Sequence, residues 1–358
     1  MTNPNVRRYV PLAAFAIGAG MIGGCDVLSG MFPKPGAPSD PDSFALIPPP
    51  QGEGVQIHIG PFDVPPGQEL QQNFYRKLAS DVAVDVKRVQ IAMRDGSHHL
   101  NLFKSYSEDV PDKVEKTFEA VAFDKYDLFA GNQNRTMDWN LPNGVGMHFK
   151  AKSQLIIQSH YVNAGTQKTP EKGEAYINLW FAKPGEVSQR MGTLFANNTM
   201  LNASPIQPYS TASYAMNFTW ARDVKIAALT GHFHSRGKRF VVWPWDGSQA
   251  GDPFYESKNW EEPPFKVLAG DGISVSAGKG IRFSSDYVNP TDKLIGFGPW
   301  VDVESVPPDK VKNGVYPVEH SNLFLFFYPA NPHKELLKSD NRNDTTEDTA
   351  AAKGGSAP

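Results

Sequence analysis

Short runs of apolar side chains, some alternating with polar ones and some unbroken, recur along most of the chain. Successive side chains of a strand point to opposite faces, so an alternating run predicts a strand with one buried face. No long stretch places apolar residues at helical spacing, so we expect mostly β structure. The predicted strand runs are Val82–Met93, Gln154–Tyr161, Ala175–Phe181, Val224–Leu229, Arg239–Trp243, Gly272–Phe283 and Asn322–Tyr328.

Turn-forming residues bracket these runs and divide the chain into many short segments. Gly 31, Pro 30 and 11% aromatic residues fit the same interpretation. A length of 358 residues suggests two domains at about 150 residues each, and the pattern predicts an all-β fold of two β-sandwiches. Lys183-Pro184-Gly185-Glu186 lies between two strand-rich halves, so we place one domain at 55–185 and the other at 186–334. The bracketing turns are Asp95-Gly96, Pro142-Asn143-Gly144, Asp246-Gly247 and Asn289-Pro290.

The two ends of the chain differ from its middle. Arg7 and Arg8 precede a short, mostly apolar or small stretch that ends at Cys25, the only cysteine, as in a signal peptide. Ile22-Gly23-Gly24-Cys25 resembles a bacterial lipobox, which predicts a lipoprotein signal peptide at 1–25 and lipidation of Cys25. The alternative is an ordinary signal peptide with a chance cysteine. We predict a proline-rich linker at 26–54 and a disordered tail at 335–358.

The N-terminal signal-peptide pattern predicts that the protein is located in the bacterial cell envelope. The N-terminal lipid would anchor the chain to a membrane and leave it exposed to the periplasm or the cell exterior. The 35 basic and 38 acidic residues form no long run of one sign, so a nucleic-acid partner is not expected.

Six of the nine histidines fall in small groups in or beside predicted strands. His232 and His234 are two residues apart and share one face of a strand, so both rings can reach one metal ion. His98 and His99 are adjacent and need a bulge or a turn to converge, which Asp95-Gly96 just upstream could supply. The remaining two members of the groups are His160 and His320.

Each group also has an interpretation without a metal. The pair His98-His99 could lie on the surface, and His160 could be a buried histidine held by one hydrogen bond. If the groups bind metal, histidine without cysteine selects zinc, copper, iron or nickel. A carboxylate from Asp286 or Glu319 as a ligand stays open. No HExxH motif and no serine elbow occurs.

From about Ile57 to Ala330 the order of the motifs resembles the copper type II ascorbate-dependent monooxygenases, the family of peptidylglycine hydroxylase and dopamine β-hydroxylase. The resemblance implies two jelly-roll-like β-sandwich domains in tandem and two copper ions per chain. The motifs are His98-His99, Leu141-Pro142-Asn143-Gly144-Val145-Gly146, Gln158-Ser159-His160-Tyr161, His232-Phe233-His234 with Gly237-Lys238, and Asn322-Leu323-Phe324.

The resemblance also implies roles for individual residues. His98, His99 and His160 would hold the first-domain copper, which relays electrons from a reductant such as ascorbate. The second-domain copper, where oxygen binds and a substrate C–H bond is hydroxylated, would be held by His232, His234 and His320. Asn322 is implied as a substrate-binding residue, and no catalytic side chain is identified.

The sequence departs from the family at two points. The third ligand of the oxygen-binding copper is a methionine in the family, and His320 stands there in this chain. A thioether favours Cu(I), whereas a third imidazole favours Cu(II), so activity at this site is in question unless Met200 or Met216 substitutes. Thr230 and Phe324 replace an arginine and a tyrosine of the peptide-amidating members, which argues against a glycine-extended peptide as substrate.

Three hypotheses follow. The first is a copper monooxygenase that uses oxygen and a reductant to hydroxylate a small organic molecule. The second is an envelope protein that binds or stores copper without turnover. The third is an adhesion or partner scaffold with vestigial sites.

Overall fold

The computed structural model describes residues 44–105, 107–119, 121, 125–163, 170–197, 200–261 and 263–330. The described residues from Phe44 onwards belong to one compact unit. The predicted signal peptide, Cys25, most of the predicted linker and the predicted tail lie outside the described residues. Within the described ranges, none of the helices has the length and apolar character needed to cross a membrane.

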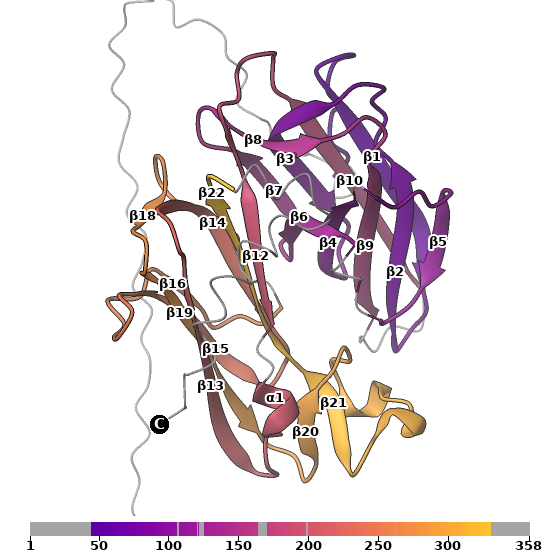
Figure 1. Ribbon diagram of the computed structural model, residues 1–358. Coiled ribbons are helices and arrows are strands. Elements are labelled where there is room, and N and C mark those ends of the chain that lie inside the picture. The colour runs from indigo at the N-terminus through magenta and orange to yellow at the C-terminus, as the bar shows by residue number, and fades with distance from the viewer. Residues whose placement is uncertain are drawn as a thin grey trace, which may run out of the picture. The chain divides into compact units, whose positions relative to one another are not determined.

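Two sheets form the first half of the compact unit (Figure 1). One has the order β1-β10-β3-β8-β11, with β7 also pairing with β3, and the other has the order β5-β2-β9-β4-β6. The strands are β1 (Gly54–Val64), β2 (Gln68–Lys77), β3 (Val84–Met93), β4 (Ser97–Ser105), β5 (Lys113–Lys116), β6 (Asp127–Asn132), β7 (Thr136–Asn140), β8 (Val145–Phe149), β9 (Gln154–Asn163), β10 (Glu171–Phe181) and β11 (Gln189–Arg190).

The second half forms two more sheets and a two-stranded parallel pair, β20-β21. The sheet orders are β12-β22-β14-β17, with β18 also pairing with β14, and β13-β19-β15-β16. The elements are β12 (Gly192–Asn197), α1 (Met200–Ala203), β13 (Ser210–Thr219), β14 (Val224–Phe233), β15 (Gly237–Trp245), β16 (Tyr255–Ser257), β17 (Lys266–Val267), β18 (Ile273–Val275), β19 (Gly280–Asn289), β20 (Leu294–Phe297), the 3-10 turns Val303–Ser305 and Pro308–Lys310, β21 (Val315–Glu319) and β22 (Ser321–Tyr328). The predicted all-β fold class is confirmed.

Strand β22 is buried along its whole length because both of its faces are covered. Leu323, Leu325 and Phe327 belong to the hydrophobic core of the second half. The alternate residues Phe324, Phe326 and Tyr328 belong to the core that the first-half sheets build. This alternation follows from the two-residue period of a strand. One strand therefore joins the cores of the two halves of the sequence.

A ring contact shows where the halves meet. Trp139 of β7 lies 4.7 Å from Phe326 of β22, measured between ring centroids, in an edge-on arrangement. Aromatic pairs at this separation stabilise by about 0.5–1.5 kcal/mol beyond the area they bury. This contact joins the sheet that contains β3 and β7 to the sheet β12-β22-β14-β17.

The predicted strand runs correspond to strands of the fold, with one exception. The run Gly272–Phe283 is two strands, β18 and β19, separated by a turn. Gly278 has a φ of 78° in that turn, a conformation that side chains other than glycine rarely adopt. Lys183–Glu186 forms a turn, with the Glu186 N–H donating to the Lys183 carbonyl at 3.0 Å. The tandem jelly-roll detail and the two-domain division stay predictions.

Candidate metal centre

Six histidines from distant parts of the sequence meet at one place. Ring centroids of neighbouring members are 4.1–5.4 Å apart. We call these residues the six-histidine cluster: His98 and His99 on β4, His160 on β9, His232 on β14, His234 directly after β14, and His320 between β21 and β22.

A bulge brings the two adjacent histidines of β4 into the same cluster. Along the β4–β9 ladder, Ser97 pairs with Tyr161 and the next pair is His99 with His160. His98 is therefore the extra residue on its strand, and the regular alternation of faces is interrupted there. The His98 and His99 ring centroids lie 5.4 Å apart, and the His160 centroid lies 5.0 Å from that of His99.

The second half supplies its histidines from the end of β14. His232 and His234 are two residues apart, and their ring centroids are separated by 5.2 Å. Phe233 between them is fully buried in the core of the second half. A tight turn follows, closed by a 2.9 Å hydrogen bond from the Gly237 N–H to the His234 carbonyl. A Cβ at Gly237 would lie 2.0 Å from the Phe233 ring, so this turn requires glycine.

Backbone carbonyls fix the orientation of two rings. Nδ1 of His234 lies 2.9 Å from the carbonyl oxygens of Trp300 and Val318, and Nδ1 of His320 lies 3.0 Å from that of Gly298. A carbonyl only accepts hydrogen bonds, so each Nδ1 carries the proton and each Nε2 keeps its lone pair. Metal-binding histidines are commonly oriented in this way.

Five members of the cluster have a buried ring nitrogen with no hydrogen-bond partner in the described structure. Such an unpaired buried group costs about 1–3 kcal/mol, and a bound cation would give each nitrogen a partner. The arrangement therefore fits a metal such as copper. The nitrogens are His98 Nε2, His99 Nδ1, His232 Nδ1, His234 Nε2 and His320 Nε2.

Within the described residues, two groups of three have ligand atoms within 4.8 Å of one another. One is His98, His99 and His232, and the other is His232, His234 and His320. His232 belongs to both groups. The second group has the same members as the second predicted ligand set, while the first half's pair also approaches a histidine of the second half. Two ions bound by these groups would be neighbours.

Five of the six imidazoles are held in the neutral form that a metal requires. Burial lowers the pKa of His98, His99, His232 and His320 well below its ordinary value. Burial likewise lowers the pKa of His234 to about 4. Because metal ions bind imidazole in its unprotonated form, few protons would have to be displaced at neutral pH.

His160 differs from the other members because a carboxylate holds it. Its Nε2 lies 3.2 Å from Oε2 of Glu69 on β2. Oε1 of Glu69 accepts hydrogen bonds from the Val301 N–H at 3.2 Å and the Ser305 hydroxyl at 3.1 Å. Burial acts to raise the pKa of Glu69, but the hydrogen bond and electrostatic interaction with His160 outweigh it, so the pKa is lowered. His160 belongs to neither group of three, although its ring contacts His98 and His99.

Glu319, left open as a metal ligand, serves the backbone instead. Its Oε2 accepts the His234 N–H at 3.1 Å, and its Oε1 accepts the Arg236 N–H at 2.8 Å. Complete burial nevertheless raises the pKa of Glu319 to about 8. The side chain holds the turn after β14 in place. Asp286, the other carboxylate left open, accepts a 2.7 Å hydrogen bond from the Ser213 hydroxyl.

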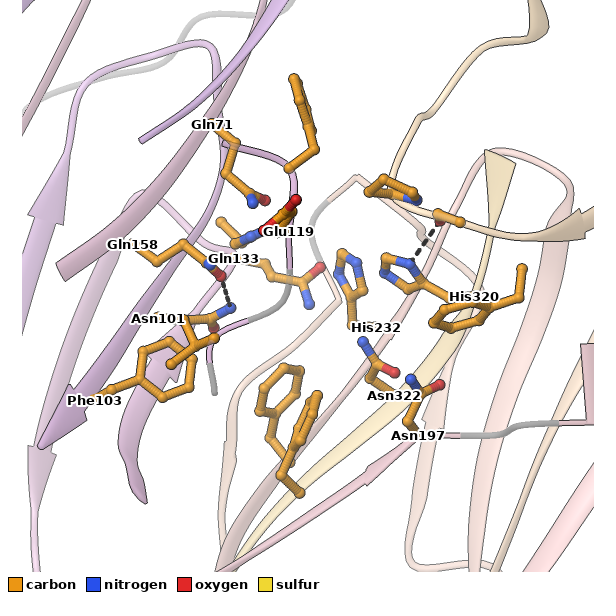
Figure 2. A pocket seen from close by; sticks show the side chains of 18 residues that line it. Gln71, Asn101, Phe103, Glu119, Gln133, Gln158, Asn197, His232, His320 and Asn322 are labelled. Carbon is orange, nitrogen blue, oxygen red and sulfur yellow. Dashed lines mark hydrogen bonds between the residues drawn. The ribbon is translucent and has the colours of Figure 1, made fainter. Parts of the chain in front are cut away.

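A cavity of about 200 Å³ adjoins the cluster (Figure 2). Figure 2 shows Asn101 and Gln158 on one wall and His232 and His320 on the other. The predicted substrate-binding residue Asn322 lines this cavity. The lining residues are Gln71, His99, Asn101, Phe103, Phe118, Glu119, Val121, Gln133, Gln158, Phe195, Asn197, His232, Phe297, Gly298, Pro299, His320, Asn322 and Phe324.

Neither methionine that was considered as a replacement ligand lines the cavity. Met216 packs against the hydrophobic core of the second half, and Met200 begins α1 with 36% of its surface exposed. The third position of the second histidine group is thus filled by the imidazole of His320.

The sequence did not point to Glu69 or, apart from Asn322, to the amide side chains of the cavity. A signal for them exists in the run Gln71-Gln72-Asn73, because three successive amides in a strand are unusual and all three are buried. Buried polar side chains need partners, so such a run indicates a polar interior.

No family model matches the chain. Two proteins named phosphate-binding protein PstS, from two strains of Staphylococcus epidermidis, are each 28% identical to it over 142 residues. The match covers 36% of this chain and 44% of each of those proteins. The chain thus spans less than half the length of these curated relatives, and the likeness does not assign it to a family.

Proposed function

We propose that this chain is a copper-dependent monooxygenase that hydroxylates a C–H bond of a small organic molecule held in the cavity. One oxygen atom of O2 enters the C–H bond and the other leaves as water. A reductant such as ascorbate supplies the two electrons and two protons that balance the reaction. The observation that carries the proposal is the convergence of five unpartnered, buried imidazole nitrogens beside a cavity.

Copper suits this cluster because all of its candidate ligands are imidazoles. Bound copper would supply the one-electron chemistry with oxygen that amino-acid side chains lack. The resemblance assigns His98, His99 and His160 to one ion and His232, His234 and His320 to the other. The geometry adds that His232 stands close enough to serve with His98 and His99 as well.

The protein itself would orient the histidine rings and hold the bound molecule beside them. The carbonyls of Trp300, Val318 and Gly298 hold the His234 and His320 rings with Nε2 free. The cavity walls would place a bound molecule next to His232 and His320. Asn322 is the cross-strand neighbour of His232, so it is placed to hold a molecule beside that ring.

Copper storage without turnover is the second candidate function. The presence of His320 as the third member of the second histidine group favours it. A third imidazole in place of a thioether favours Cu(II), whereas reaction with oxygen begins from Cu(I). The same fold and cluster would then bind copper and release it to another protein.

Phosphate binding, the function in the names of the PstS proteins, has less support at this site. Neither lysine nor arginine is among the described residues that line the cavity. Burial also keeps the pKa of the cluster's His232 and His320 low, which disfavours positive charge there. Phosphate recognition relies on cationic and backbone donors, so we do not assign it here.

We also propose that the protein works in the bacterial cell envelope. The basis is the N-terminal sequence, in which a short apolar stretch ends at Cys25. A lipid on Cys25 would anchor the chain to a membrane, with the six-histidine cluster on the periplasmic or outer side.

Metal content and oxygen uptake test the proposal on the full chain. Metal-free protein is loaded with copper, dialysed and analysed for metal, with His232→Ala as the test variant and His148→Ala as a matched control. His148 is paired with Asp85 at 3.0 Å and is not part of the cluster. We expect two copper ions in the parent and the control, and a loss in His232→Ala.

Turnover then separates the two candidates. A monooxygenase consumes oxygen and ascorbate together when a substrate is added, whereas a store retains copper with no such consumption. A parent protein that holds no copper after loading would contradict both.

A further inference from the structure

The two walls of the cavity carry the same order of side chains. On each wall, every second residue contributes a side chain to the cavity. Counted from the six-histidine cluster, these side chains are an imidazole, an amide and a phenyl ring. The period of two keeps all three side chains on one face of the strand. On β4 the order is His99, Asn101 and Phe103, and on the opposite wall it is His320, Asn322 and Phe324.

Strand register extends each amide into a row. On one wall, Asn322 lies between Asn197 of β12 and His232 of β14 as their cross-strand partner. On the other wall, Gln158 of β9 is the cross-strand partner of Asn101. The cavity therefore has a polar layer of carboxamides between the six-histidine cluster and a layer of aromatic rings.

On the β4–β9 wall the amides largely satisfy one another. Asn101 Nδ2 donates to Gln158 Oε1 at 3.2 Å, and Gln158 Nε2 donates to Asn73 Oδ1 at 3.2 Å. Gln71 Nε2 donates to the Thr117 carbonyl at 2.9 Å. These hydrogen bonds hold the side chains in place, so the N–H groups that they use are not free to bind a ligand.

Three other lining amides have an oxygen that lacks a hydrogen-bond partner within the described structure. They are Gln133 Oε1, Asn197 Oδ1 and Asn322 Oδ1. Gln133 Nε2 donates to the Gly231 carbonyl at 3.4 Å, which identifies the other atom as the oxygen. The terminal torsion of asparagine and glutamine is soft, so a small rotation turns each oxygen toward a ligand. Asn197 and Asn322 also carry N–H2 groups, so the site can both accept and donate and favours a ligand whose polar group does both.

The charge of the lining excludes two classes of ligand. Apart from its histidines, the only acidic or basic member of the described lining is Glu119, an exposed residue. In the metal-free chain an anion would find no lysine or arginine there, and a cation would be desolvated without a buried carboxylate beside it. Burying an unpaired charge costs far more than burying a hydrogen-bonded neutral group.

The aromatic side chains of the cavity determine the shape of the ligand that fits. Phe195 of β12 and Phe324 of β22 lie 5.0 Å apart between ring centroids, and both line the cavity with Phe103. Phenyl rings at this spacing favour contact with another flat apolar group.

We propose that the cavity binds an uncharged, flat aromatic molecule whose polar group both donates and accepts hydrogen bonds, such as a primary carboxamide. Its ring lies against Phe103, Phe195 and Phe324, and its polar group faces the amides of Gln133, Asn197 and Asn322. The proposal rests on the proposed function only where it calls this molecule the substrate, because the binding itself requires no metal.

Three probes of nearly the same shape and different charge test it: benzamide, benzoate and benzamidinium. Each is titrated by calorimetry into the full chain, once without metal and once after copper loading. We expect benzamide to bind at least about tenfold more tightly than either charged probe, the ratio that about 1.4 kcal/mol produces. Equal or tighter binding of benzoate or benzamidinium would overturn the assignment, as would no binding of benzamide.

A near-isosteric variant locates the site. Asn197→Leu removes one acceptor at the end of β12, and the matched control Asn217→Leu alters β13, where Asn217 Oδ1 accepts from Arg282 at 3.1 Å outside the cavity. We expect Asn197→Leu to weaken benzamide binding about tenfold and the control to leave it unchanged. Equal affinity in Asn197→Leu and its control would place the ligand elsewhere.

The copper content of the same samples keeps the two proposals separate. Benzamide binding without copper binding would contradict the proposed function and leave this inference standing. Copper binding without selectivity for benzamide would contradict this inference alone.

Discussion

In the proposed copper site, the side chain at position 320 would determine which copper oxidation state the second histidine group favours. His320 has a ring centroid 4.1 Å from that of His234 and 4.6 Å from that of His232, and its Nε2 has no partner among the described residues. Three neutral nitrogen donors stabilise Cu(II) more than two nitrogens and a thioether do. The identity of this one residue therefore bears directly on whether the site reacts with oxygen.

We predict that His320→Met raises the reduction potential of bound copper, because the softer sulfur favours Cu(I). Spectroelectrochemical titration of the copper-loaded protein measures the shift, and oxygen uptake with ascorbate should rise in parallel. His148→Met serves as the control, since His148 pairs with Asp85 away from the cluster. An unchanged potential in His320→Met would show that position 320 is not a ligand.

Glu69 is a positioning residue for His160 and connects it to the second half of the chain. One carboxylate oxygen of Glu69 lies within hydrogen-bond distance of the His160 ring. The other oxygen accepts hydrogen bonds from the Val301 N–H and the Ser305 hydroxyl. Loss of such an outer partner typically lowers metal affinity about 10–100-fold.

We predict that Glu69→Gln lowers copper affinity within that range while the fold persists. Competition with a chelator of known affinity measures it, and Glu115→Gln, a change on exposed β5, is the control. If the copper affinity of Glu69→Gln equals that of the parent, His160 is not a ligand and the carboxylate serves packing alone.

At the scale of elements, strand positions could be predicted and strand partners could not. The unbroken apolar run of β22 indicates a strand buried on both faces, and both faces are indeed covered. The six histidines could be selected by residue type and local spacing. Their convergence depends on the bulge at His98 and on the packing of β4 and β9 against β14 and β22. No local pattern encodes that packing, so the sharing of His232 between two groups was not foreseen.

Strands β1, β10 and the end of β3 are tied together by one buried carboxylate. Glu174 accepts hydrogen bonds from Arg94 at 2.7 Å and Tyr176 at 3.2 Å, and it lies 2.9 Å from Nε2 of His58. Burial acts to raise the pKa of Glu174, but these partners outweigh it, and the pKa is lowered from 4.5.

We predict that Glu174→Gln lowers the free energy of unfolding by about 2 kcal/mol at pH 7, the size expected for hydrogen bonds to a charged group. A carboxylate with a depressed pKa stabilises the fold above its unfolded pKa of 4.5, and this stabilisation is lost as pH falls through the lower folded value. The difference between parent and variant should therefore shrink below pH 4.5. Urea unfolding at several pH values measures it, and a difference that stays constant with pH would contradict the role of the charge.

At the scale of the whole molecule, the two halves of the sequence share a core and a site. Phe326 of β22 packs on Trp139 of β7, and both belong to one hydrophobic core. His98 and His99 of the first half meet His232 of the second. Elements joined in these two ways cannot separate without exposing the core and breaking the cluster, so we expect the halves to unfold together.

We predict a single thermal transition for the metal-free full chain and a higher midpoint after copper loading. A ligand that binds only the native state stabilises it by about 2.7 kcal/mol at a free concentration of 100 times its Kd. Because the histidines that would bind copper come from both halves, copper should stabilise the whole compact unit. Calorimetry with and without copper measures the shift, which His232→Ala should largely remove because both groups lose a member. His148→Ala should keep it. Two transitions, of which copper moves only one, would show that the halves fold independently and that the metal is held by one of them.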